Sequence, residues 1–212
     1  MNFLCKLINV LFVNRHTKLL DTNSEMTDTT DQAALNLYAR AEGLKAEGGA
    51  NNKLELRKTY RRLLVDHLDY ALDKKVEAEL WNSFKAEITE LQKTTRSSKP
   101  AKSVNAQTVL EWTLETAQGF YSVLLLEIQA ASEAGSSREN QGSDSAVARE
   151  NEEYVRQHIL VHLGDLARYM NATEQAEWFY RKAVVELPSY GHAYSQISLL
   201  ESAKGKVRNE VV

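Results

Sequence analysis

The sequence predicts an all-α protein built as an antiparallel helical bundle. Among its 212 residues are only two prolines and nine glycines, so few positions would interrupt a helix. Leucine, alanine, glutamate and lysine dominate the remainder, a mixture that favours long helices. Apolar side chains recur at steps of three and four residues over most of the chain, which is the spacing of one buried helical face. A chain of this length can also bury a core.

The amino-terminal region differs in character from the rest of the chain. Met1–Val13 is apolar but too short to cross a bilayer, and no small-residue cleavage site comes after it. We interpret residues 1–25 as a variant or flexible leader on a soluble protein, with a signal or transit peptide as the alternative, and expect no membrane association. Met26 is a candidate alternative start, because a helical pattern begins just after it. Cys5 is the single cysteine, which excludes an internal disulfide and fits a reducing compartment.

Four helices are predicted in the first two thirds of the chain. Asp28 or Thr30 is expected to cap the first helix, and the glycine pair at 48–49 is expected to end it. The stretch TTRSSKPAKS, at 94–103, is expected to be a loop. The predicted helices cover residues 33–47, 53–72, 73–91 and about 106–134.

A connector and three further helices complete the predicted domain. Residues 132–151 contain almost nothing that can be buried, so we expect a disordered connector inside one domain that spans 26–204. Thr173 is expected to cap the sixth helix, and Pro188 is expected to end it. The three predicted helices cover 154–170, 173–187 and 191–205, and residues 205–212 are expected to form a tail.

The last helices carry a tetratricopeptide-like pattern. Small residues such as Gly164 and Ala176 let two antiparallel helices approach closely, and Tyr180 fills the groove between them. One and a half repeats cannot stand alone, so these helices should pack on the four before them. The pattern comprises Leu160, Leu163, Gly164, Ala176, Tyr180, Ala183 and Pro188, with Tyr194 and Ile197 starting a second unit.

The sequence contains no motif of a catalytic site. It has no glycine-rich phosphate loop, no nucleophile elbow and no HExxH pair, so we expect neither an enzyme nor a cofactor. His158 and His162 lie one helical turn apart, with Asp165 three residues further along, and this spacing could hold a metal ion. Ordinary hydrogen bonding beside the core is the commoner role of such residues, so we expect no metal.

Positive charge beside aromatic residues is the more informative feature. A phosphate needs charge together with several donors, which an arginine, a lysine and a tyrosine hydroxyl can supply. Arg168 and Tyr169 end the apolar stripe of one predicted helix, and Lys85 follows Phe84 on another. The alternative is that Arg168 pairs with Asp165 and that Lys85 is a solvated charge.

A second group of cations lies on one side of the predicted helix 53–72. The formal net charge of −3 favours no general attraction to nucleic acid, so any nucleic-acid site must come from local clustering of this kind. The group is either a solvated face or a binding patch, and it comprises Arg57, Lys58, Arg61 and Arg62.

Two long segments of the sequence are distinctive, namely LVDHLDYALDKKVEAELWNSFK (Leu64–Lys85) and LVHLGDLARYMNATEQAEWFYRKAVVELPSYGHAYSQISLL (Leu160–Leu200). Both resemble segments of the ever-shorter-telomeres and SMG five-six-seven family of nonsense-mediated mRNA decay factors. The stretch GFYSVLLLEI, at 119–128, resembles a third and weaker family segment. The resemblance extends from about Met26 to Leu200, apart from the serine-rich connector.

This resemblance implies a 14-3-3-like bundle, C-terminally truncated relative to the family, that binds phosphoserine segments of the up-frameshift-one RNA helicase. Lys85, Arg168 and Tyr169 match the family's phosphate-binding positions. The resemblance also implies a heterodimer with an SMG-five paralogue, an indirect link to the mRNA degradation machinery, and a cytoplasmic location that includes processing bodies and nuclear shuttling.

Two other functions stay open. One, implied by the resemblance to the ever-shorter-telomeres branch, is a telomerase accessory protein that contacts nucleic acid through the cations at 57–62 or through the groove beside Arg168. The other is a scaffold that recognises unphosphorylated helices. For a chain that ends this early, we also expect Val184, Ile197 and Leu199 to be exposed and the stability to be reduced.

Overall fold

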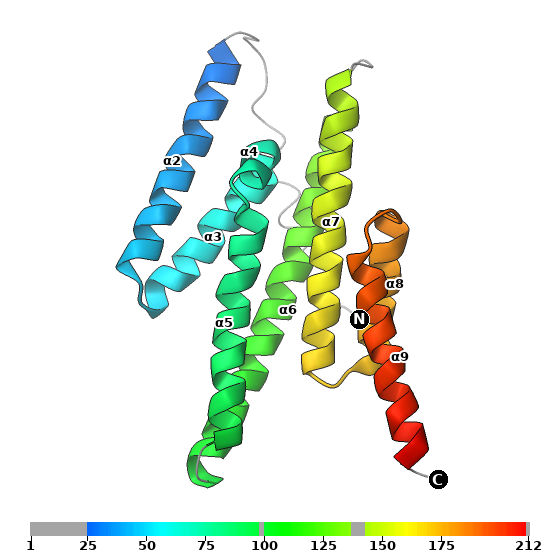
Figure 1. The fold of residues 1–212 in the computed structure, drawn as a ribbon. Helices are drawn as coiled ribbons and strands as arrows, with labels where there is room; N and C mark the ends of the chain where they lie inside the picture. Colours follow the sequence, from blue (N-terminus) through cyan, green and yellow to red (C-terminus); the bar gives the residue numbers. More distant parts are fainter. Residues whose placement is uncertain (1–24, 98–99, 137–142, 211–212) are drawn as a thin grey trace, which may run out of the picture.

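The computed structural model describes residues 25–97, 100–136 and 143–210, and every regular element within them is an α-helix (Figure 1). The predicted all-α class is therefore confirmed. Residues 1–24 of the predicted leader, Cys5 included, lie outside the described part of the chain. The helices are α2 (Glu25–Glu47), α3 (Ala50–Asp66), α4 (Leu68–Asp73), α5 (Val76–Ser97), α6 (Pro100–Ser136), α7 (Ser143–Tyr169), α8 (Thr173–Glu186) and α9 (His192–Glu210).

Helices α5, α6 and α7 form the centre of the molecule. Figure 1 shows α5 and α7 running in the same direction, with α6 antiparallel to both and packed against each. Helices α2 to α4 lie on the α5 side, and α8 and α9 lie on the α7 side. Among the described helices, none has the length and apolar character needed to cross a membrane.

The core falls into two clusters that meet at α7. The larger cluster joins all the helices from α2 to α7, and its largest fully buried side chains include Tyr60, Phe84 and Tyr121. The smaller cluster joins α7, α8 and α9 around the fully buried ring of Tyr180. Its other members include the small residues at 167, 176, 183 and 193, all alanines, so these three helices can pack closely.

The last helices are less exposed than we expected. Leu199 is 59% exposed, as predicted, but Val184 and Ile197 are partly buried against the smaller cluster. The prediction was wrong for these two residues because α8 and α9 pack on each other as well as on α7.

Three predicted helix starts were wrong. Asp73, expected to begin the helix over 73–91, is the last residue of α4, and α5 begins at Val76. Asp28 and Thr30 lie inside α2, which extends to Glu25, so neither is its cap. At the start of α8 the capping position is Ala172, without a side-chain hydrogen bond, and Thr173 is already the first helical residue. The chain enters α8 through a short turn in which Asn171 has a φ of 60°.

The predicted breaks also differ from the observed ones. The helix predicted over 53–72 is interrupted at His67, where the backbone leaves the helical region with φ −143° and ψ 55°, and it becomes α3 and α4. The predicted loop at 94–103 is helical up to Ser97 and again from Pro100, a residue that fits a first helical position. Ser98 and Lys99 lie outside the described residues.

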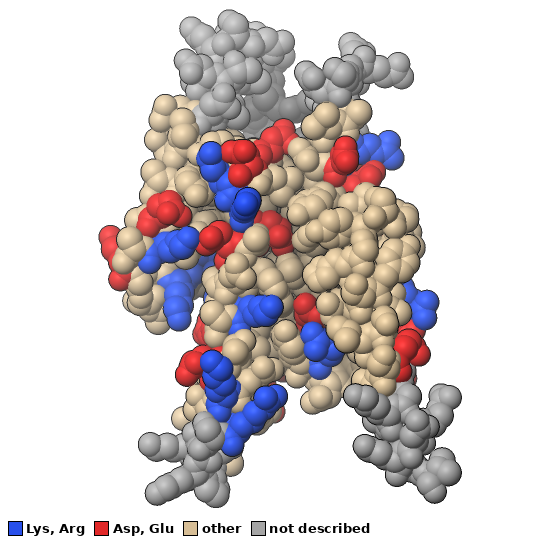
Figure 2. Space-filling model, viewed as in Figure 1, with Lys and Arg blue, Asp and Glu red and all other residues tan. Residues whose placement is uncertain are grey.

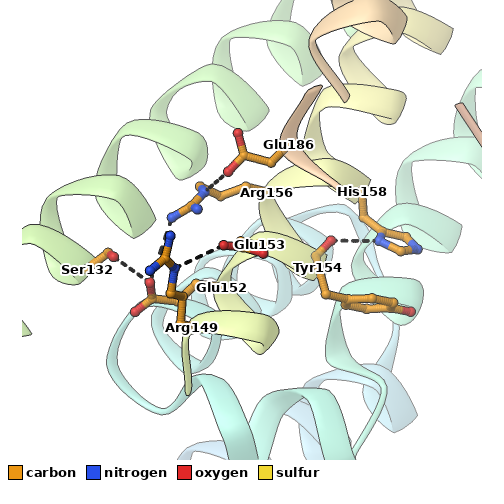
Figure 3. Close-up of polar contacts among 8 residues, drawn as sticks. All are labelled: Ser132, Arg149, Glu152, Glu153, Tyr154, Arg156, His158 and Glu186. Carbon is orange, nitrogen blue, oxygen red and sulfur yellow. Dashed lines mark hydrogen bonds and ion pairs between the residues drawn. The ribbon is translucent and has the colours of Figure 1, made fainter. Parts of the chain in front are cut away.

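The connector predicted over 132–151 is helical over 132–136 and 143–151, whereas 137–142 lies outside the described residues. Polar contacts hold the first half of α7 in place, although it buries little apolar surface (Figure 3). The Ser132 hydroxyl donates to Glu152, and Arg156 pairs with Glu186 of α8. Asn151 donates to Asp69 of α4 at 2.8 Å. Composition alone cannot distinguish such a helix from a solvated linker.

Candidate anion-binding site

One face of α7 carries a row of polar side chains beneath the surface. Gln157, His158, His162 and Asp165 follow one another at steps of one, four and three residues, and all four are buried. Buried polar groups are costly unless they find partners, so their partners reveal what this face of the helix is built to hold.

His162 connects α7 to α5 within this row. Its Nε2 hydrogen-bonds to the Glu77 carboxylate, and its ring stacks on the Trp81 indole with centroids 4.1 Å apart. Burial alone would raise the pKa of Glu77, but the hydrogen bond to His162 and its charge outweigh burial and lower that pKa. This buried hydrogen-bonded pair, with the Trp81 ring stacked on the imidazole, therefore joins α5 to α7.

His158 lies one turn earlier on the same face. Its Nδ1 is 2.8 Å from the Tyr154 carbonyl oxygen, as Figure 3 shows, and the two rings lie 4.1 Å apart. Within the described residues, no group of three histidine, cysteine, aspartate or glutamate side chains is placed to hold a metal ion. The spacing of His158, His162 and Asp165 reflects separate hydrogen bonds to Tyr154, Glu77 and neighbouring side chains.

Burial of His158 predicts a pH dependence of folding. Burial lowers its pKa below the usual 6.5, despite the opposing charge of Glu77. As the pH drops through 6.5, His158 therefore binds a proton in the unfolded chain but stays neutral in the folded one. The free energy of unfolding should fall over this pH range. Urea denaturation over this range should show the fall in the wild type and a weaker fall in His158→Gln. Equal slopes would contradict the prediction.

Arg168 is not a free cation. Its Nη2 donates to Asp165 Oδ1 at 3.0 Å, and its Nε lies 3.4 Å from the Tyr180 hydroxyl oxygen. Burial would lower the pKa of Arg168, but the bonds to Tyr180 and Asp165 raise it, so the guanidinium is always charged. The alternative in which Arg168 pairs with Asp165 is thus realised. Its side chain nevertheless stays 36% exposed, and a guanidinium has further N–H groups to offer.

Tyr169 is in contact with Arg168. The guanidinium carbon lies 4.9 Å from the centre of the Tyr169 ring, and the ring itself packs partly buried on the main core. Burial, and then the charge of Asp165, raises the pKa of the Tyr169 phenol. The phenol is therefore protonated at neutral pH and can donate a hydrogen bond.

Lys85 lies near the middle of α5. The stacked rings of Trp81 and His162 lie at the same height on α5 and α7, which run in parallel (Figure 1). Along the helix axes, Lys85 lies one turn, about 6 Å, beyond Trp81, and Arg168 lies about 9 Å beyond His162. Lys85 and Arg168 therefore lie at similar heights on separate helices. Lys85 is exposed, and it forms no ion pair or hydrogen bond with any described residue. No hydrogen bond or ion pair joins Lys85 to Arg168 or Tyr169.

The candidate site, made of Lys85, Asp165, Arg168 and Tyr169, has one net positive charge from two cations and one carboxylate. Arg168 offers remaining N–H groups, Tyr169 a phenol, and Lys85 a solvated ammonium, all of which are donors to an anion. On the face drawn in Figure 2, charged side chains of both signs are interspersed over the α2–α5 half. An anion would therefore be recognised by local donors and not by a broad positive field.

The cations at 57–62 are mainly structural. The Arg57 side chain is 11% exposed, lies 3.7 Å from the centre of the Phe84 ring and pairs with a glutamate at 2.7 Å. Lys58 and Arg61 pair with glutamates at 2.8 and 2.6 Å. Among the four, only Arg62 is exposed without a pairing to a described residue. Arg57 and Arg61 are therefore held in partly buried ion pairs, whereas Lys58 and Arg62 are exposed, as on a solvated face.

Sequence reasoning missed Glu77 and the role of Tyr180. Glu77 lies 85 residues before its partner His162, and nothing local in the sequence links the two. Tyr180 was assigned only to helix packing, yet its hydroxyl donates to Asp165 at 2.7 Å. One signal in the sequence could have pointed to these contacts. Several polar residues lie on the otherwise apolar face of the helix that became α7, and buried polar residues need hydrogen-bond partners.

Comparison with known proteins identifies relatives of this chain. The family model described as telomerase activating protein Est1 matches residues 74–174, which include Lys85, Arg168 and Tyr169. The chain is 40% identical over 190 residues to the nonsense-mediated mRNA decay factor SMG7 of Danio rerio. That alignment covers 78% of this chain and 16% of the relative, so the chain spans a small part of the relative's length.

A solved structure has the same fold. The chain superposes on a chain of the C. elegans SMG5–SMG7 complex with a TM-score of 0.57. The match covers 81% of this chain and 45% of that one. At 16% sequence identity, the likeness is one of fold, and it agrees with a 14-3-3-like helical bundle.

Proposed function

Because the chain belongs to the family of SMG7 and telomerase activating protein Est1, we propose that it is a phosphoserine-reading adaptor in nonsense-mediated mRNA decay. The ligand is a phosphorylated segment of the up-frameshift-one RNA helicase. As an adaptor in the cytoplasm, the protein makes and breaks no covalent bond and links the helicase to the degradation machinery. It pairs with an SMG5-like paralogue, and the fold shared with a chain of the SMG5–SMG7 complex supports this partnership.

The observation that carries this proposal is the set of donors offered by Lys85 near the middle of α5 and by Arg168 and Tyr169 at the end of α7. A charged guanidinium with unused N–H groups, a protonated phenol and an unpaired ammonium lie at similar heights. A phosphoserine carries about two negative charges and three acceptor oxygens, which match such donors. The nucleic-acid alternative receives less support, because three of the four cations at 57–62 already pair with carboxylates.

Charge reversal at the site tests the proposal. Titrations with phosphorylated and unphosphorylated helicase peptides should show tighter binding of the phosphorylated form. Lys85→Glu and Arg168→Glu should each reduce that binding at least about tenfold, since each removes a charge-assisted contact. Arg168→Gln serves as a second variant, because a glutamate beside Asp165 could disturb folding.

Arg62→Glu is the matched control. It reverses an exposed, unpaired cation on the same chain but outside the candidate site. Its affinity for the phosphopeptide should stay near that of the wild type. Equal affinity of the wild type for both peptides, unaffected by substitution of Lys85 or Arg168, would end the adaptor proposal. A steep salt dependence of RNA binding that Arg62→Glu reduces would instead support the nucleic-acid alternative.

A further inference from the structure

Three side chains between α7 and α8 form a closed hydrogen-bonded ring. Arg168 Nη2 and the Tyr180 hydroxyl both donate to Asp165 Oδ1, at 3.0 and 2.7 Å. Arg168 Nε points back to the same hydroxyl at 3.4 Å. Asp165 and Tyr180 are buried, whereas Arg168 reaches the surface. The ring thus joins the α7–α8 interface to the exposed cation.

We infer that Asp165 and Tyr180 are positioning residues that hold the Arg168 guanidinium in one orientation toward an anion. This inference rests on the proposed function. The edge of the guanidinium formed by Nε and Nη2 faces the buried pair, while the side chain stays 36% exposed, so an anion can reach it from the solvent side. A guanidinium already held in place loses less conformational freedom when the anion binds, so it binds more tightly than a freely rotating one.

Gly164 makes this arrangement possible. A Cβ atom at that position would lie 2.3 Å from Tyr180 Cε1, so the ring packs directly on the backbone of α7. The hydroxyl of Tyr180 can therefore reach Asp165, the next residue of the same helix. The close packing of α7 and α8 therefore also allows Tyr180 to donate a hydrogen bond to Asp165, the residue that holds Arg168.

A purely structural role would be different in one respect. If the ring only fastened α8 to α7, its loss would lower stability but would leave the preference for phosphate unchanged. The informative quantity is therefore the ratio of affinities for a serine-phosphorylated helicase peptide and its unphosphorylated counterpart. Tyr180→Phe is the informative variant, because it removes one oxygen and keeps the buried ring.

Tyr180→Phe should reduce this affinity ratio by about three- to tenfold, the size expected for one hydrogen bond. In the Arg168→Gln background, the same substitution should have no further effect, since the held group is absent. Arg156→Gln is the control, because it breaks a different α7–α8 pair and should leave the ratio unchanged. An unchanged ratio in Tyr180→Phe, or an equal loss in both backgrounds, would overturn the inference.

A second readout does not depend on any ligand. In the free protein, the Arg168 Nε–H should give a sharp and slowly exchanging NMR signal that disappears in Tyr180→Phe. Similar exchange in both proteins would refute positioning. If Arg168→Gln leaves peptide binding unchanged, the proposed function fails, and the positioning inference is then decided by this signal.

Discussion

Gly164→Ala should lower the free energy of unfolding by about 2–3 kcal/mol, net of the better helix propensity of alanine. The added Cβ would lie 2.3 and 2.5 Å from two carbon atoms of the Tyr180 ring. That ring is fully buried, and its hydroxyl is fixed to Asp165, so it cannot swing aside. Either α8 must move away from α7 or the ring must leave its site, and both changes break the smaller core cluster.

Gly119→Ala is the matched control for this substitution. Gly119 is also helical, in α6, but it is exposed, and an added Cβ would meet no atom within 4 Å. Alanine there should raise the free energy of unfolding by about 1 kcal/mol, because it restricts the unfolded chain. Urea denaturation of the two variants should therefore give shifts of opposite sign. Shifts of the same sign would refute the close approach of α7 and α8.

Glu77→Ala should cost about 3–5 kcal/mol, because it leaves a buried histidine without its partner. The Nδ1 atom of His162 already lacks a partner among the described residues, so the variant would bury an imidazole with no hydrogen bond at either nitrogen. The ring is held against Trp81 at 4.1 Å and cannot easily turn to water. The loss should appear in urea denaturation as a lower midpoint.

Glu79→Ala is the control on the same helix. Glu79 pairs with Lys45 at 2.7 Å, but both side chains are more than two-fifths exposed. Removal of such a pair should cost less than about 1 kcal/mol. Equal costs for the two glutamates would show that burial of the Glu77–His162 pair contributes nothing.

The Glu77–His162 pair should also make the free energy of unfolding depend on pH in the acid range. Because the folded-state pKa of Glu77 lies below its usual 4.5, the pair stabilises the fold fully above that pH. The contribution should be lost as the pH falls below 4.5 and through the folded-state pKa. In Glu77→Gln, the acid branch of the stability profile should be shallower than in the wild type.

Local spacing along the chain was enough to predict the helices and the faces that they bury. The apolar steps in the predicted helices correspond to buried residues such as Leu110, Leu114 and Leu124 of α6, since burial of one face follows from the helical repeat alone. The same spacing placed Gly164 opposite Tyr180, because close packing of two helices requires a residue without a side chain. These features depend on neighbours within one or two helices, so a local pattern contains them.

Helix ends and the roles of charged residues depend instead on how distant segments pack together. Local spacing predicts neither the break at His67 nor the helical start of α7, where Asn151 donates to Asp69, 82 residues earlier in the chain. In the sequence, Arg57, Arg61 and Lys85 are all cations on predicted helices. In the structure, Arg57 and Arg61 pair with Glu87 and Glu127, whereas Lys85 remains solvated. Whether a cation is paired or free to bind a ligand depends on which carboxylate the fold brings near it. Such pairs join residues far apart along the chain, so a local sequence pattern cannot predict them.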